Sequence, residues 1–140
     1  EVSSAMLAAN GSTGIVVRGG RKSFSALVLD PELPAKLIGS GGLITQVAIS
    51  ADGARTVLAA RDDSKKAWEA FLVRGFTQQV DLFELSSPPI AVGMVPSANR
   101  AYVAQEHPEG RITFVDLDTG LARTLTGFEL AARVVDGSEP

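Results

Sequence analysis

RITFVDLDTGLARTLTG, residues 111–127, contains two strand-like runs joined by a turn. The runs are Arg111–Leu117 and Ala122–Thr126, and Asp118-Thr119-Gly120 lies between them. Aspartate and glycine favour tight turns, because the Asp side chain can bond to the nearby backbone and Gly adopts positive φ without steric cost. This stretch therefore predicts a β-hairpin, and the preceding sequence resembles less regular copies of the same unit.

Short apolar runs recur about every ten residues along the chain, separated by Gly, Pro, Asn and Asp. Runs of this kind are typical of strands. The predicted strands cover 5–9, 14–18, 24–29, 35–38, 44–50, 55–60, 68–74, 79–85, 89–95, 100–105, 111–117, 122–126 and 131–135. Only Asp62–Phe71 has the length of a short helix, and we interpret it instead as a polar loop that enters an alternating strand. The sequence thus predicts an all-β fold.

Internal repeats give a second signal, since a fixed period predicts a repeat architecture. Leu29–Gly39 aligns with Leu117–Gly127 without a gap, at an offset of 88 residues (117 − 29). Val47–Ala60 aligns with Val92–Gln105 at an offset of 45 (92 − 47). One repeat of about 44 residues accounts for both offsets.

The middle repeat differs from the others in its length. Ile15–Gly19 aligns with Phe71–Gly75 at an offset of 56 (71 − 15), which indicates a longer excursion between Arg61 and Gly75. Either the middle repeat lacks its last strand, or Trp68–Arg74 and Gln79–Leu85 are its third and fourth strands. We favour the second interpretation because it keeps four strands in each repeat.

A unit of about 44 residues with four short strands has the size of one β-propeller blade. Val47–Ala59 resembles the inner two strands of bacterial propeller repeats of the surface-layer and lactonase-like (YVTN-type) kind, in which an apolar strand enters a Ser-Pro-Asp-Gly turn. Ile112–Thr126 resembles the outer two strands of the same repeats. The match is divergent, because Ala51 stands where these repeats usually carry proline and Ser97-Ala-Asn99 replaces the Asp-Gly turn.

The resemblance implies about three four-stranded antiparallel blades, approximately at residues 5–39, 44–85 and 89–127, with a further strand starting in 131–140. Closed propellers have at least four blades, so three form an incomplete propeller or a segment of a larger one. The chain begins at Glu1 rather than Met, and we expect a processed chain or a fragment. Each end of an open stack would expose an apolar flank. We expect further blades of the same chain or a protein partner to cover these flanks.

The composition limits the partners. The chain has 13 basic and 16 acidic residues with a net charge of −3, and no basic stripe predicts nucleic-acid binding. Cysteine is absent, which excludes disulfides, thiolate metal sites and cysteine nucleophiles. No apolar run approaches the roughly 20 residues that span a bilayer. The resemblance implies a bacterial protein of the periplasm or cell envelope, and it leaves association with a membrane complex open.

His107 is the only histidine, and it follows Glu106 in a loop between two predicted strands. An imidazole beside carboxylates can act as a metal ligand or general base. Because the chain has no second histidine and no cysteine, we favour an exposed loop residue. Asp62, Asp63 and Ser64 could offer oxygens to a hard cation, but the lysine pair at 65–66 favours a solvated charged loop.

The glycine-rich stretches Arg18–Lys22 and Gly39–Gly42 are interpreted as turns, because a phosphate-binding loop is followed by a helix and strands follow here. No Gly-x-Ser-x-Gly elbow is present. We therefore predict no catalytic residue, no metal ligand and no cofactor. Phe76 lies at a predicted turn, and it is a candidate for partner contact because aromatic residues are enriched in interface cores.

Two functions are compatible with these observations. The favoured one is a non-enzymatic binding or scaffolding subunit that packs against a protein partner or further blades, with Phe76, Asp62, Glu106 and His107 as candidate contact residues. The alternative is part of a larger lactonase-like or quinoprotein-like propeller enzyme, whose site is completed elsewhere. In that enzyme, Asp62, Glu106 and His107 would be the contributors from this chain.

Overall fold

The computed structural model describes residues 1–127 and 129–130 of the 140-residue chain. In this part, three four-stranded antiparallel sheets follow one another along the sequence, which confirms the predicted all-β class. The predicted strand at 131–135 lies outside the described residues. Among the described residues, no helix is long and apolar enough to cross a membrane.

Each sheet is formed by four consecutive strands. Sheet 1 contains β1 (Val2–Leu7), β2 (Thr13–Arg18), β3 (Ser23–Leu29) and β4 (Glu32–Gly39). Sheet 2 contains β5 (Leu43–Ile49), β6 (Arg55–Asp62), β7 (Ala67–Arg74) and β8 (Gln79–Leu85). Sheet 3 contains β9 (Pro89–Val95), β10 (Arg100–Gln105), β11 (Arg111–Asp116) and β12 (Ala122–Thr126). The short 3-10 helix η1 (Pro96–Ala98) connects β9 to β10.

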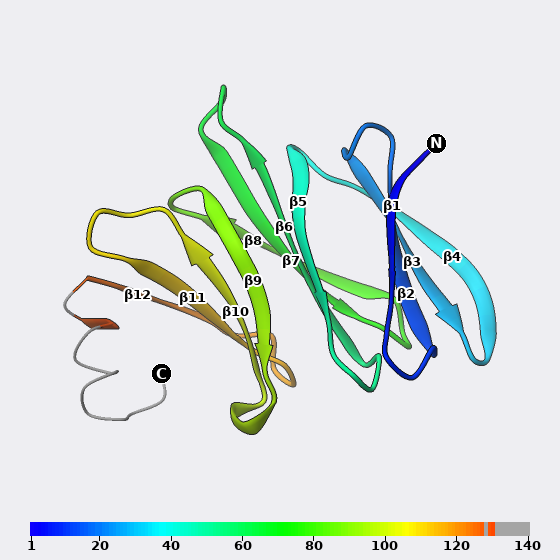
Figure 1. The fold of residues 1–140 in the computed structure, drawn as a ribbon. Coiled ribbons are helices and arrows are strands. Elements are labelled where there is room, and N and C mark those ends of the chain that lie inside the picture. The colour runs from blue at the N-terminus through cyan, green and yellow to red at the C-terminus, as the bar shows by residue number, and fades with distance from the viewer. Residues whose placement is uncertain (128, 131–140) are drawn as a thin grey trace.

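The three sheets are stacked face to face, with sheet 2 between sheets 1 and 3 (Figure 1). The first strand of each sheet lies at the inner edge, where β5 contacts both β1 and β9. The ambiguous segment at 62–71 is a turn followed by β7, so the strand interpretation is confirmed. Sheet 2 has four strands, with β7 and β8 as the third and fourth, as predicted.

Sheet 2 is buried on both faces because it lies between the other two. The side chains of a strand alternate between its faces. In β6, Leu58 and Ala60 pack toward sheet 1, whereas Val57 and Ala59 pack toward sheet 3. The continuous apolar run of β6 therefore has a direct physical cause, since a strand with one solvated face would alternate with polar residues.

Two hydrophobic cores hold the sheets together. The first core joins sheets 1 and 2, and it includes an edge-to-face pair between Phe24 and Phe71, with ring centroids 5.4 Å apart and an interplanar angle of 70°. The second core joins sheets 2 and 3 through buried aliphatic residues such as Leu72, Val103 and Val115. Aromatic pairs in this geometry add about 0.5–1.5 kcal/mol beyond their buried area.

The turns alternate between the two ends of the sheets. We call the end that carries the β2–β3, β6–β7 and β10–β11 turns the upper rim, and the opposite end the lower rim (Figure 1). At the lower rim, Gly53 has φ 75° and Asn99 has φ 54°. Both values lie in the left-handed region, which Gly adopts without steric cost and Asn tolerates better than most residues.

Candidate functional site

Three of the four candidate residues lie at the upper rim. Asp62 is the last residue of β6, and Glu106 and His107 begin the loop between β10 and β11. Phe76 instead lies at the lower rim, in the turn between β7 and β8, with 44% of its surface exposed. The upper rim therefore combines titratable side chains from two neighbouring sheets, and Phe76 belongs to a different surface.

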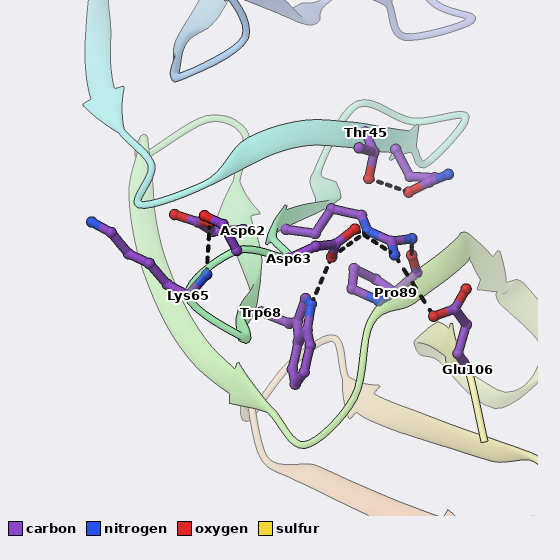
Figure 2. A network of polar contacts seen from close by, with 10 residues as sticks. Thr45, Asp62, Asp63, Lys65, Trp68, Pro89 and Glu106 are labelled. Carbon is purple, nitrogen blue, oxygen red and sulfur yellow. Dashed lines mark hydrogen bonds and ion pairs between the residues drawn. The ribbon is translucent and has the colours of Figure 1, made fainter.

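Arg61 is the centre of the upper-rim contacts. Its Nε and Nη2 donate to the two carboxylate oxygens of Asp63, both at 3.0 Å. Its Nη1 donates to the carbonyl oxygen of Pro89 at 3.1 Å, and Nη2 lies 3.7 Å from Oε2 of Glu106. Figure 2 shows Asp63, Pro89 and Glu106 converging on this point. The guanidinium thus links sheet 2 to sheet 3.

We missed Arg61 in the sequence, although the repeat contains a signal for it. The offset of 45 residues places Glu106 at the position equivalent to Arg61 (106 − 45). Equivalent positions of neighbouring blades lie at the same height in a stack of repeats. Opposite charges at such positions predict an ion pair between blades.

Asp63 is held by two donors. Besides Arg61, the indole Nε1 of Trp68 donates to Oδ1 of Asp63 at 3.0 Å (Figure 2). The hydrogen bond from Arg61, followed by that from Trp68, lowers the pKa of Asp63 below its usual value. In turn, the bond to Asp63 raises the pKa of Arg61. Both side chains therefore stay ionised at neutral pH.

Asp62 stabilises its own turn. Its Oδ1 accepts hydrogen bonds from the hydroxyl of Ser64 at 2.7 Å and from the backbone N–H of Lys65 at 3.1 Å. These bonds, with that of Ser64 the larger cause, lower the pKa of Asp62. Within residues 1–127 and 129–130, no group of three or more His, Cys, Asp or Glu side chains is placed to hold a metal ion.

His107 also makes a local contact. Its Nδ1 accepts a hydrogen bond from the backbone N–H of Glu109 at 3.1 Å, and its carbonyl accepts one from the N–H of Gly110 at 3.0 Å. The residue is partly buried, whereas we predicted an exposed loop residue, because the contacts with Glu109 and Gly110 fold the loop back on it. The imidazole therefore shapes the turn that leads into β11.

A groove of about 610 Å³ lies at the upper rim, between the β4–β5 connection and the β6–β7 turn. Its lining includes Lys22 and Lys65 as well as Asp62 and Asp63, so charges of both signs face it. A second groove, of about 570 Å³, lies at the lower rim between sheets 2 and 3. Such volumes fall within the range of small-molecule sites.

The lower-rim groove has an apolar floor formed by Ile49, Met94 and Leu117. Arg55 lines it too, and its guanidinium Nε donates to the carbonyl oxygen of Leu117 at 2.6 Å, which ties β6 to sheet 3. Asp52 lies at its edge, where the backbone N–H of Ala54 and the hydroxyl of Ser50 bond to its carboxylate and lower its pKa. The polar side chains of this groove, Arg55 and Asp52, therefore stabilise the neighbouring turns and the contact between sheets 2 and 3.

The outer face of sheet 1 is an apolar surface that no described residue covers from outside. We use this name for the face directed away from sheet 2. On it, Leu37 is 65% exposed, Val2 60% and Leu7 57%. Their pairing partners across the strands are Ser25, Arg18 and Gly14 respectively, which point away from the first core. This face is apolar but open.

No family model matches the sequence. No curated protein matches it either. Solved structures do match the fold. The β-propeller domain of Myceliophteria thermophila Cps50 (Swd1) aligns with a TM-score of 0.63 at 14% identity, over 89% of this chain and 38% of that chain. Kuenenia stuttgartiensis hydrazine synthase aligns with a TM-score of 0.62 at 15% identity, over 89% and 35%.

The β-propeller domain of the Trilobed protease from Pyrococcus furiosus, described as having an open velcro topology, aligns with a TM-score of 0.60 at 13% identity, over 89% of this chain and 42% of that chain. These matches and the three sheets show an incomplete β-propeller, so the sheets are its blades. The chain spans about two fifths of the length of the structures it matches.

Proposed function

We propose that this chain is a non-enzymatic segment of a β-propeller that binds or scaffolds another polypeptide. The observation that carries the proposal is the outer face of sheet 1, where Val2, Leu7 and Leu37 are all more than half exposed. Soluble proteins rarely leave contiguous apolar surface open unless it meets a partner. A binding role gives this face a physical purpose.

The free energy available from covering the face supports the same conclusion. Complete burial of a Val or Leu side chain contributes about 1.5–3 kcal/mol. Since the three side chains are roughly half to two-thirds exposed, a partner that covers them gains about 1 kcal/mol from each. Leu27 and Val16, which are partly buried on the same face, would add to this gain.

The upper-rim geometry supports a non-enzymatic role. Asp63 and Arg61 are engaged with each other, Asp62 is engaged with its own turn, and His107 accepts from the backbone of Glu109. Each of these groups therefore stabilises the loop or turn in which it lies. The side chains on which a propeller enzyme would draw are thus used to hold loops in place.

The subtype and the location are part of this proposal. The turn Ser50-Ala51-Asp52-Gly53 supports the surface-layer or lactonase-like subtype, because Asp52 accepts from Ser50 and Ala54 while Gly53 takes positive φ, which explains an Asp-Gly turn physically. Repeats of this subtype imply a periplasmic or envelope location. Fractionation of the source cells with an antibody against the chain tests it, and recovery in the cytosol would contradict it.

Native mass spectrometry of the protein expressed in its source cells, as wild type and as variants, tests the binding role. Leu37→Glu should release the bound polypeptide, because a carboxylate would be buried at the interface without a partner. The matched control Leu121→Glu, at a lower-rim turn residue that is 73% exposed, should leave the assembly intact. A wild-type mass equal to that of a monomer whose outer face binds no apolar dye would overturn the proposal.

A second variant separates binding from catalysis. Simultaneous substitution of Asp62, Glu106 and His107 by alanine should leave the mass of the assembly unchanged, because none of them lies on the outer face of sheet 1. If the wild-type assembly showed an enzymatic activity that this variant lost while its assembly stayed intact, the non-enzymatic part of the proposal would be refuted.

A further inference from the structure

We propose that the lower-rim groove between sheets 2 and 3 binds a basic side chain, lysine or arginine, of an extended polypeptide segment, with an apolar neighbour of that side chain on the groove floor. The inference goes beyond the proposed function, because it names a second binding surface that shares no residue with the outer face of sheet 1. Three observations carry it: the groove is particular to this junction between sheets, its carboxylates have oxygens open to a cation, and the surrounding rim is acidic.

The groove lies between turns of two neighbouring sheets. The β5–β6 turn of sheet 2 forms one wall, and the β9–β10 and β11–β12 turns of sheet 3 form the other. The floor is apolar, since Ile49 and Met94 are partly buried there and Leu117 is 7% exposed. Asp52 and Asp118 at the edges are exposed. The groove therefore opens at the rim, where a side chain can enter while the backbone that carries it stays outside.

The corresponding place between sheets 1 and 2 is closed by direct contact. There the hydroxyl of Thr13 donates to the carbonyl oxygen of Gly53 at 2.8 Å. A Cβ at Gly53 would clash with the hydroxyl of Ser12, and a Cβ at Gly75 would lie 3.2 Å from the methyl group of Thr13. The two glycines thus allow the turns of sheets 1 and 2 to touch.

Larger side chains occupy the equivalent positions between sheets 2 and 3. Arg55 takes the place of Thr13, because the carbonyl oxygen of each accepts a hydrogen bond from the N–H five residues earlier, at 2.8 and 2.9 Å. Leu117 takes the place of Gly75, because the N–H of each donates to a carbonyl in the first hairpin turn of its own sheet, at 3.0 and 2.9 Å. Arg55 crosses to the carbonyl oxygen of Leu117 at 2.6 Å. The groove therefore depends on these two side chains, and the repeat alone does not produce it.

Two carboxylates at the edge of the groove can each offer an oxygen to a cation. Oδ1 of Asp52 accepts the hydrogen bonds of its own turn, and Oδ2 of Asp118 accepts one from the side-chain amide of Asn99 at 2.8 Å. In the described part of the chain, the second oxygen of each carboxylate accepts no hydrogen bond. Arg55 is the cation of the groove, and its Nε and Nη1 donate to backbone carbonyls. The lining thus has two negative charges against one positive charge.

The lower rim around the groove also exposes acidic side chains. Asp30 and Glu32 at the β3–β4 turn are exposed. The arginines next to the lower-rim turns are only partly exposed, and these are Arg55, Arg74 and Arg100. Complementary charge therefore favours a basic segment at this rim and disfavours an acidic one. The apolar stem of a lysine or arginine can lie along the groove floor while its charged end reaches the carboxylates.

Nuclear magnetic resonance of the methionine methyl groups tests this inference in the 140-residue chain. The chain has two methionines, of which Met94 lies on the groove floor and Met6 lies on β1, outside the groove. The probe is an N-acetylated, C-amidated tripeptide with lysine between two leucines. The methyl signal of Met94 should shift as this peptide is added, and the signal of Met6 should stay in place as the internal reference.

Neutral versions of the peptide and of the protein test the role of charge. The same tripeptide with Nε-acetyl-lysine keeps the long side chain without its charge, and it should bind about tenfold more weakly. Asp118→Asn should weaken binding of the lysine peptide by about the same factor, while its side-chain oxygen can still accept from Asn99. The matched control Asp30→Asn removes an exposed lower-rim carboxylate that does not line the groove, and it should leave binding unchanged.

The outcomes separate this inference from the proposed function. An unshifted Met94 signal at millimolar peptide, or equal binding of the charged and acetylated peptides, would overturn the inference. Hexylamine that binds as tightly as the lysine peptide would identify a site for a small amine and overturn the polypeptide occupant. If Leu37→Glu releases the bound polypeptide while Met94 does not respond to the peptide, only the groove inference fails. The reverse pair of results would overturn only the proposed function.

Discussion

Phe71 offers the sharpest test of how the blades are held together. It is 3% exposed and packs edge to face on Phe24 of the neighbouring sheet, with the ring centroids 5.4 Å apart. Truncation of a buried Phe to Ala costs about 3–5 kcal/mol. Of this loss in unfolding free energy, about 0.5–1.5 kcal/mol comes from the aromatic pair. Because domains unfold with about 5–15 kcal/mol in total, Phe71→Ala should remove a large fraction of the stability.

Urea unfolding followed by the fluorescence of Trp68 measures this loss. Trp68 is the only tryptophan and packs on the second core, so it reports on sheet 2 without touching the Phe pair. With a denaturant slope of about 2 kcal/mol per molar, Phe71→Ala should lower the urea midpoint by about 2 M. Phe76→Ala is the matched control, because Phe76 is 44% exposed and its loss should change stability by about 0.5 kcal/mol or less.

A double-mutant cycle with Phe24→Leu and Phe71→Leu isolates the pair itself, and the coupling should be about 0.5–1.5 kcal/mol. A loss of less than about 1 kcal/mol for Phe71→Ala, or a loss no larger than that of Phe76→Ala, would contradict this prediction. Either result would mean that sheets 1 and 2 are not packed through this contact.

The remaining predictions concern single contacts between and within the blades. Gly75→Ala should cost about 1–3 kcal/mol in urea unfolding, because its Cβ would clash with the carbonyl oxygen of Gly53, whereas the Cβ of Gly39→Ala meets nothing within 4 Å and this variant should be near neutral. Thr13→Val should cost about 1–2 kcal/mol by thermal unfolding, since the buried hydroxyl donates to Gly53 at 2.8 Å; an unchanged midpoint would show that the bond contributes nothing. The pKa of Asp52 is lowered in the folded state, so the contribution of this carboxylate to stability is present above its ordinary pKa of 3.8 and is lost as pH falls through the folded pKa. Asp52→Asn should therefore make the free energy of unfolding less dependent on pH below about 4. The same pH dependence of unfolding in wild type and variant would contradict this.

Most of the strands and turns could be predicted from local patterns in the sequence. The hairpin of residues 111–127 and the turn at Asp52-Gly53 depend on nearest neighbours, and both appear as predicted. The long apolar run of β6 is explained by a sheet buried on both faces. Asp62–Phe71 was harder, because a charged turn followed by aromatic residues has the length of a helix, and only the pairing of β7 with β6 and β8 decides it.

The upper rim was less accessible to sequence reasoning. Asp62, Glu106 and His107 were singled out for their chemistry, but their local hydrogen bonds depend on how each turn closes. Arg61 escaped notice because no local pattern marks it, and its contact with Glu106 becomes predictable only when the 45-residue repeat is used to align equivalent positions of neighbouring sheets. The outer face of sheet 1 could not be placed either, since the alternation of β3 alone does not tell which side faces sheet 2.

Hydroxyl-radical footprinting of side chains, compared between the isolated 140-residue chain and the protein in its native assembly, tests whether another polypeptide covers the outer face of sheet 1. Val2, Leu7 and Leu37 should be labelled in the isolated chain, where they are 57–65% exposed, and should be protected in the assembly. Leu121 should be labelled equally in both, as the internal reference. Equal labelling of Leu37 in the two states would show that its face stays open to water, and it would contradict the claim that the face binds another polypeptide.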